Sequence, residues 1–203
     1  MVVAFTGGMR LYQLALAAVV ALLPLSARAQ SPAEQRMVAF GDIGIAKTAD
    51  DEGVLGTGMS LSSGIGVRLT ERLTVQAILE RIGYDRNLDY LRIEGRVIFT
   101  GVEASWLWKP GRVHPFVTVG AGFFNDDSTW TSRSRIPFGP TTEDVSEHHY
   151  TLAAMTSSTG FEVAASKHAS VRAAFRFHGL LDTGDDLAPH MMIQGSIGVA
   201  WRW

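Results

Sequence analysis

Apolar and polar residues alternate with a period of two along most of this sequence. The segment 190–203 shows the pattern most clearly, because large apolar side chains occupy most of its odd-numbered positions and small or polar ones lie between them. The segments 58–70, 73–82 and 170–181 have the same alternation, with Ile78 as an exception. A period of two is that of a β-strand with two different faces, so the sequence predicts an all-β fold.

The alternation and the turn residues between the alternating segments divide the chain into eight predicted strands. These strands are expected at residues 37–46, 58–70, 73–82, 91–108, 116–124, 149–165, 170–181 and 190–203. Their connections alternate between shorter and longer ones, and the longest is 125–148. An even number of strands with such connections predicts an antiparallel up-and-down barrel with both of its ends on one side. Charges of both signs and two aromatic residues in 125–148 predict a surface loop that can contact a partner or lipopolysaccharide.

Two of the predicted strands alternate less regularly. In the segment 91–108, charged residues continue the parity that is apolar further along the strand; they are Arg92, Glu94 and Arg96. This strand therefore either leaves the apolar environment before these residues or is re-phased by a bulge near Gly95. In the segment 149–165 the apolar parity changes along the strand, which predicts a slip or a bulge around Ser157–Gly160.

The size of the side chains indicates which face of the barrel is turned inward. The apolar parity carries the bulky residues, whereas the other parity carries small residues and a few long charged ones. Small and interlocking charged side chains suit the narrow interior of an eight-stranded barrel, so the pattern favours a transmembrane β-barrel with its apolar face toward lipid. The inward polar residues are expected to form a neutralising network that plugs the interior; they are Arg68, Gln76, Glu80, Glu103, Arg172, Arg176, Gln194 and Arg202. In the alternative, the apolar face of the strands is turned inward, and the chain is a soluble lipocalin-like barrel that binds a small apolar ligand.

Tryptophan residues cluster near the predicted ends of two strands. Tryptophan prefers the interface between lipid and water, so these residues are expected to mark the periplasmic membrane interface. They are Trp106, Trp108, Trp201 and Trp203.

The N-terminal segment has the features of a secretory signal peptide. Arg10 precedes an apolar run of about 15 residues, which is shorter than the roughly 20 needed to cross a membrane as a helix. A small-x-small pattern ending at Ala29 then predicts cleavage after this residue. We therefore expect a signal peptide at 1–29, a short periplasmic lead at 30–36 and the barrel at 37–203.

Composition narrows the classes of function. The chain has 203 residues, of which 46% are hydrophobic and 19% charged, and it has no cysteine, which excludes disulfide scaffolds, thiolate metal sites and cysteine nucleophiles. The formal net charge is -2, and removing Arg10 and Arg28 with the signal peptide leaves 16 basic against 20 acidic residues, or -4. Nucleic-acid binding needs a basic surface, so no nucleic-acid partner is expected.

Two stretches carry a resemblance to a known family. The segment 198–203 ends in an aromatic residue and resembles the signal that the barrel-insertion machinery of the bacterial outer membrane recognises. The hairpin 101–123, with its Lys-Pro-Gly turn, resembles the central hairpin of small outer-membrane barrels of the opacity-protein and OmpA-like kind. The resemblance implies a monomeric protein in the outer membrane, in contact with its lipid and lipopolysaccharide. It also implies a non-enzymatic role in envelope structure or surface interaction, without a cofactor.

A rim-active enzyme that modifies lipid A is a second alternative, because barrels of this size include such enzymes. Catalysis would require a group of reactive side chains near the outer rim. His178 is expected to face inward near the outer end of its strand, and His190 near the outer end of the neighbouring one. No serine follows His178 closely, as a deacylase-like triad would require. We therefore expect no catalytic residues and no metal site. If a transition metal does bind, these two histidines are the candidate ligands, because imidazole suits such ions.

Overall fold

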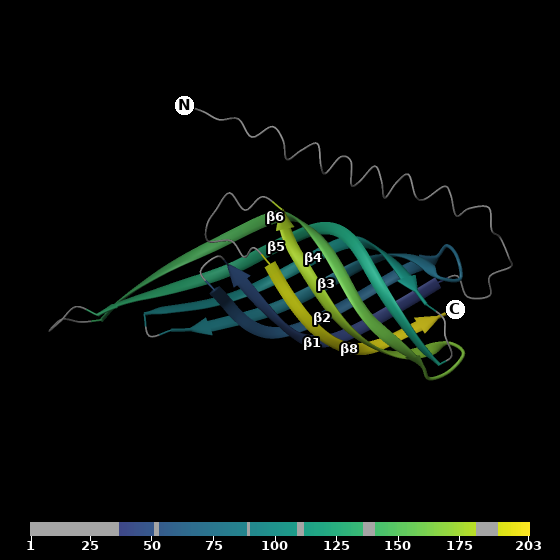
Figure 1. The fold of residues 1–203 in the computed structure, drawn as a ribbon. Coiled ribbons are helices and arrows are strands. Elements are labelled where there is room, and N and C mark those ends of the chain that lie inside the picture. Colours follow the sequence, from purple (N-terminus) through teal and green to yellow (C-terminus); the bar gives the residue numbers. More distant parts are fainter. Residues whose placement is uncertain (1–36, 51–52, 89, 109–111, 136–140, 182–190) are drawn as a thin grey trace, which may run out of the picture.

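The computed structural model describes residues 37–50, 53–88, 90–108, 112–135, 141–181 and 191–203. The predicted signal peptide at 1–29 and the lead at 30–36 lie outside these residues. The described residues form eight strands, β1 (Met37–Asp50), β2 (Gly53–Arg68), β3 (Leu73–Asn87), β4 (Leu91–Leu107), β5 (Val113–Arg135), β6 (Thr141–Ala164), β7 (Ala169–Leu181) and β8 (Met191–Arg202). Each strand pairs with its neighbours in the sequence, and β8 pairs with β1, which closes an antiparallel barrel (Figure 1). The predicted eight-stranded up-and-down barrel is therefore confirmed.

One end of the barrel carries the short turns and the two ends of the described barrel chain. Tight turns follow β2 and β6, where Leu69 N–H donates to Leu73 O and Ala165 N–H donates to Ala169 O. Met37 and Trp203 exchange two backbone hydrogen bonds of 2.9 and 3.1 Å at the same end. Short turns face the periplasm in outer-membrane barrels, so we assign this end to the periplasm and the opposite one to the cell exterior.

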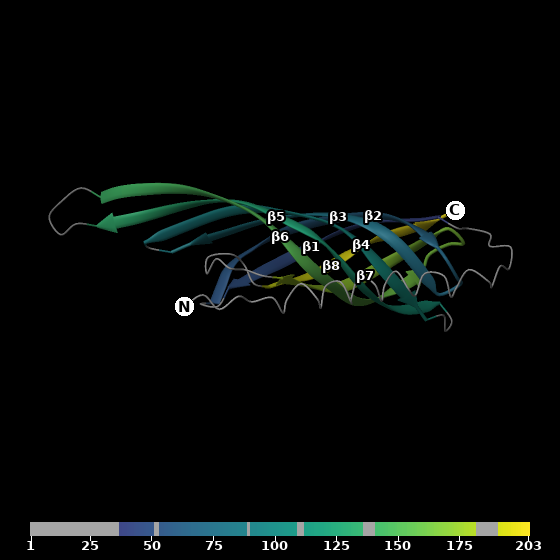
Figure 2. The same cartoon turned by 90° about the horizontal axis from the view of Figure 1, so that it is seen from above.

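At the outer end the hairpin of β5 and β6 reaches beyond the other strands, and the hairpin of β3 and β4 runs beside it as far as Leu91, which pairs with Ser132 (Figures 1 and 2). The register of β5 and β6 is unbroken from Val113 opposite Val163 to Arg135 opposite Thr141. The prediction of a loop at 125–148 was therefore wrong, because most of these residues continue the two strands. Their outward face changes from apolar to polar beyond Phe123, and this removed the alternation on which the strand prediction depended.

The two irregular strands keep one register along their length. β4 pairs continuously with β3 and β5, so its charged residues lie beyond the apolar part of the wall, which was the first of the two predicted alternatives. β6 pairs with β5 and β7 without a shift, so the predicted slip or bulge around Ser157–Gly160 was wrong. Tyr150 and Leu152 break the pattern of β6 because they lie on its inward parity, where the interior is apolar. A register shift does occur between Thr48 and Ala49, where β1 pairs with β2.

The polarity of the barrel wall is inverted relative to a soluble protein. Large apolar side chains with exposed fractions of about one third to two thirds form a belt on the outer surface, and Ile65, Val102, Val119 and Ile197 are examples. Charged side chains such as Glu80 and Arg176 are buried inside. A soluble lipocalin-like barrel is excluded, because so much exposed apolar surface is stable only in contact with lipid. Among the described residues, no helix has the length and apolar character needed to cross a membrane.

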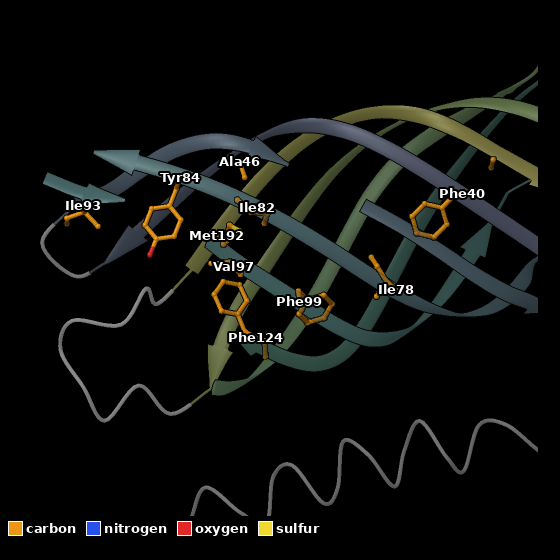
Figure 3. Close-up of a cluster of buried hydrophobic side chains, with 12 residues drawn as sticks. Phe40, Ala46, Ile78, Ile82, Tyr84, Ile93, Val97, Phe99, Phe124 and Met192 are labelled. Atoms are coloured by element: carbon orange, nitrogen blue, oxygen red, sulfur yellow. The ribbon is translucent and has the colours of Figure 1, made fainter. Parts of the chain in front are cut away.

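The outer half of the interior is filled by apolar side chains. Phe99, Phe124 and Met192 lie close together inside the barrel, whereas Phe40 lies further toward the periplasmic end (Figure 3). Ile78, the exception to the predicted alternation of its strand, belongs to this interior cluster and is 4% exposed. Apolar residues therefore occupy both parities in parts of the wall, which explains why the periodicity is imperfect there.

Candidate functional site

The centre of the interior is occupied by a guanidinium group between two carboxylates. Arg176 Nη1 donates to Glu80 Oε2 at 2.8 Å, and Arg176 Nη2 lies 3.4 Å from Glu103 Oε2. Gln76 Nε2 donates to the same oxygen of Glu103 at 3.0 Å. All four residues are 5% exposed or less, so the structure brings these four predicted interior residues from β3, β4 and β7 into one network.

A second interior cation lies nearer the periplasmic end. The guanidinium of Arg172 is stacked between the rings of Phe40 and Phe116, at 4.3 and 4.9 Å from their centroids. Arg172 Nε lies 3.4 Å from Asp42 Oδ1, and both residues are buried. Asp42 was not among the predicted interior residues, although its parity on the first strand pointed to the same face.

The remaining predicted interior residues lie on either side of these two groups. Gln194 is buried and donates to the hydroxyls of Ser60 and Ser62 at 2.8 and 3.2 Å. Arg202 is partly buried near the periplasmic end, where it pairs with Glu162. Arg68 is also only partly buried, and none of the hydrogen bonds among the described residues joins it to the other members.

His178 lies in the interior and not at the outer rim. It is completely buried, its Nε2 is 3.5 Å from Glu80 Oε2, and it packs edge-on against Phe99 at 4.8 Å between ring centroids. Its side chain faces inward near the outer end of β7, as expected from the sequence, but it is buried and not accessible at the rim. His190 lies outside the described residues, and within those residues no group of three or more potential ligands could hold a metal ion.

The four tryptophans predicted at the interface lie at the periplasmic ends of their strands. Their exposed fractions are between 39% and 50%. Trp106 and Trp201 lie within β4 and β8, and Trp108 and Trp203 directly follow these strands. The role of these residues as a membrane-interface girdle stays a prediction.

The outward face of the extension carries ion pairs instead of apolar side chains. On this face Asp127 accepts hydrogen bonds from Arg96 at 3.0 Å and from the ring nitrogen of His149 at 2.8 Å. Arg133 pairs with Glu143 at 3.1 Å across the same hairpin. The hydrogen bonds from His149 and Arg96 hold the pKa of Asp127 below its usual range, so its carboxylate stays charged at neutral pH.

The inward face of the extension carries a row of aromatic and hydroxyl groups. The ring of His148 lies between those of Trp130 and Tyr150, with centroids 5.2 and 6.0 Å apart. The two ring nitrogens of His148 are hydrogen-bonded at 3.1 Å to the hydroxyls of Ser146 and Tyr150. The sequence did not reveal this row, because it required 125–148 to be strands.

A buried carboxyl group lies beneath that row. Tyr84 donates its hydroxyl hydrogen to Asp126, whose two oxygens are each 3.0 Å away. Asp126 follows Phe123, the last large apolar residue on the outward face of β5, and thus lies beyond the belt. Burial raises the pKa of Asp126 to about 6, and the hydrogen bond from Tyr84 opposes this rise.

We expect the barrel to become more stable as the pH falls from 7.5 to 5. The pKa of Asp126 is higher in the folded protein than in the unfolded chain, so folding favours the protonated carboxyl. This contribution is complete below about pH 4 and is lost as the pH rises through about 6; in full it amounts to about 3 kcal/mol, of which about 1–1.5 kcal/mol is lost between pH 5 and pH 7.5. In Asp126→Asn the free energy of unfolding should differ less between pH 5 and pH 7.5, as measured by urea unfolding at both pH values. An unchanged pH profile in the variant would show that groups other than Asp126 are responsible.

The fold is similar to solved structures of bacterial outer-membrane barrels. Neisserial surface protein A (NspA) is 15% identical with a TM-score of 0.60, over 82% of this chain and 97% of that chain. The N-terminal β-barrel domain of OprF from Pseudomonas aeruginosa is 14% identical with a TM-score of 0.50, over 84% and 100%. Ail of Yersinia pestis, in complex with the heparin analogue sucrose octasulfate, is 14% identical with a TM-score of 0.51, over 84% and 100%.

These likenesses confirm the small eight-stranded outer-membrane barrel that the hairpin and the terminal strand predicted. At this level of identity they show the fold alone. The sequence matches no protein-family model and no curated protein. The function must therefore be argued from the arrangement of this chain's own residues.

Proposed function

We propose that this protein is an outer-membrane barrel with a closed interior that acts in surface interaction through the β5–β6 extension. The observation that carries the proposal is the unbroken pairing of these two strands well beyond the apolar belt, with charged side chains on the outward face. A membrane anchor alone does not need strands that continue past the lipid. Ordered and exposed backbone at the outer end is a suitable scaffold for binding.

The interior supports a role other than transport. Eight strands enclose a space just wide enough for side chains. Here the space holds the network around Arg176 and, toward the exterior, a packed apolar cluster that includes Phe99 and Phe124. An aqueous path through the barrel would have to displace both, so we infer that the interior is closed.

The contacts of His148 favour a non-enzymatic role over a rim-active hydrolase. Ser146 and His148 form a hydrogen-bonded pair, as a nucleophile and a general base would. The other ring nitrogen of His148 meets the neutral hydroxyl of Tyr150, and not a carboxylate that could stabilise a protonated imidazole. Both residues also lie beyond the apolar belt, away from the lipid substrate of a lipid A-modifying enzyme.

The charge of the extension indicates the kind of partner. Residues 125–148 contain five acidic residues, at 126, 127, 143, 144 and 147, and two arginines, at 133 and 135, which gives a formal net charge of -3, or -2 without the buried Asp126. A polyanion such as the sucrose octasulfate bound to Ail would be repelled by this balance. We therefore infer that the extension binds a positively charged surface.

Shortening the hairpin should abolish this binding while the barrel still folds. In the variant, residues 127–149 are replaced by an Asn-Gly turn, which joins the paired residues Asp126 and Tyr150 and removes four acidic residues against two arginines. Wild-type protein in nanodiscs is expected to bind polylysine in a salt-dependent manner, and the shortened variant at least about tenfold more weakly. Biolayer interferometry measures both affinities, and heat-modifiable gel migration reports folding.

A charge-neutral variant separates charge from shape. Glu143→Gln, Asp144→Asn and Glu147→Gln together keep the hairpin and remove three of the acidic groups. This variant should also lose most of the polylysine binding and should not gain affinity for sucrose octasulfate. The proposal would be wrong if the shortened barrel bound polylysine as tightly as the wild type.

A further inference from the structure

The periplasmic mouth of the barrel contains a small polar cavity. Its volume is about 20 Å³, enough for one or two water-sized groups. Every strand of the barrel contributes to its lining, which comprises Val38, Arg68, Thr74, Gln76, Ser105, Leu107, Phe116, Glu162, Arg172 and Arg202. The cavity is therefore a vestibule at the end of the closed interior, opposite to the β5–β6 extension.

Positive charge exceeds negative charge in this vestibule. Three guanidinium groups and one carboxylate line it. Arg202 pairs with that carboxylate, which belongs to Glu162, and also donates to Ser170 at 3.0 Å. Arg172 has its own partner deeper in the barrel, Asp42, at 3.4 Å. Both of these cations are thus matched by acids of the protein.

Arg68 is the vestibule cation that lacks such a match. It is partly buried at the end of β2, and in the described part of the chain no hydrogen bond or ion pair joins it to another residue. The exposed Glu71 attracts it electrostatically. A guanidinium carries five N–H donors, and leaving them unused in a partly dehydrated site is costly.

Neutral donors line the same cavity. Thr74 and Ser105 are partly buried on β3 and β4, directly opposite each other in the register. Within the described residues neither hydroxyl takes part in a side-chain hydrogen bond. The vestibule therefore combines one unmatched guanidinium with two hydroxyl groups that are available to donate.

We propose that this vestibule binds the terminal oxyanion group, a phosphate or a carboxylate, of a molecule on the periplasmic side. The planar fork of an arginine matches two oxygens of such a group, and the hydroxyls can donate to the same oxygens. Attraction between opposite charges is stronger in a partly dehydrated site than in water. The volume admits only one or two oxygens of the end group, so the rest of the molecule stays in the periplasm.

Isothermal titration of the folded full-length protein in detergent, with sodium phosphate and sodium acetate, tests this site. Arg68→Gln should weaken the binding of both anions at least about tenfold, since it removes the charge and the fork. Arg81→Gln is the matched control, because Arg81 is exposed on the outward face of β3 and its loss should leave the affinity unchanged. Sodium chloride at equal ionic strength measures non-specific screening.

Two outcomes would overturn the proposal. One is equal affinity of wild type and Arg68→Gln for phosphate, and the other is complete displacement of phosphate by chloride at equal concentration. If Arg68→Gln does not show the heat-modifiable shift of a folded barrel, Thr74→Val with Ser105→Ala takes its place. This double variant keeps the charge and should bind phosphate about threefold to tenfold more weakly; unchanged binding would refute the site.

The source of the oxyanion can be distinguished in nanodiscs. If lipid headgroups occupy the vestibule, phosphatidylglycerol discs should block added phosphate, and discs whose lipids carry no net charge should not. If a soluble molecule is the ligand, phosphate should bind equally in both. Either result supports the vestibule as an anion site, whereas loss of binding in both kinds of disc would refute it for the membrane-embedded protein.

Discussion

Replacement of Arg176 by methionine is expected to lower the free energy of unfolding of the barrel by about 3–5 kcal/mol, because it leaves buried carboxylates without their cation. Arg176 lies between Glu80 and Glu103 in the middle of the interior, and both carboxylates are fully buried. Methionine fills a similar volume, so the loss comes from charge and not from a cavity. Urea unfolding of the protein in phospholipid vesicles, followed by tryptophan fluorescence, measures the change.

Two further variants show whether the loss is electrostatic. Adding Glu80→Gln and Glu103→Gln to Arg176→Met removes the uncompensated charges and should restore most of the lost free energy. Arg72→Met is the matched control for the arginine itself, since Arg72 is exposed in the turn between β2 and β3. An equal loss in the triple variant and in Arg176→Met would show that the network stabilises the barrel through packing alone.

Replacement of Val119 by arginine is expected to destabilise the folded barrel by about 2–4 kcal/mol, the cost of a cation near the middle of a membrane. Val119 is 57% exposed on β5, midway between Val113 and Phe123, which limit the apolar belt on this strand. Arginine fits this position sterically, so the cost arises from lipid contact. The same urea unfolding in vesicles measures it.

Val145→Arg is the matched control for the belt. Val145 has nearly the same exposure, 59%, but it lies on the extension between Glu143 and Glu147 on the outward face of β6. Water surrounds this face, and the two acids favour a cation there, so we expect a change within about 0.5 kcal/mol. Similar losses of unfolding free energy in the two variants would show that the apolar belt is not limited to the positions between Val113 and Phe123.

The sequence was sufficient to predict the architecture of the barrel wall. The number of strands, their order and the side that faces lipid all follow from a period of two combined with the sizes of the side chains. The positions where the strands end on the outer side could not be predicted, because strands were recognised in the sequence by an apolar outward face. Asp127 and Glu147 satisfy the strand period but not that criterion, and for this reason β5 and β6 appeared shorter than they are.

The partners inside the barrel were not predictable in the same way. Parity placed Glu80 and Arg176 on the inward face, but their contact spans 96 residues of sequence. It depends on the strand stagger around the whole closed sheet, which no local pattern encodes. Tyr150 and Leu152 also could not be placed from the sequence. They lie on the inward parity in the apolar outer half of the interior, and apolar residues there contradict the simple rule that the inside of a membrane barrel is polar.

The unbroken pairing of β5 and β6 also sets how far from the cell the protein can make contact. Ten residues follow Asn125 in β5, and at about 3.4 Å per residue they span about 34 Å along the strand. The tip of a flexible loop of equal length would spend most of its time close to the membrane, among the sugars of neighbouring lipids. A paired ribbon holds its end at a fixed distance from the apolar belt, so the height of the outer tip is set by the length of the two strands.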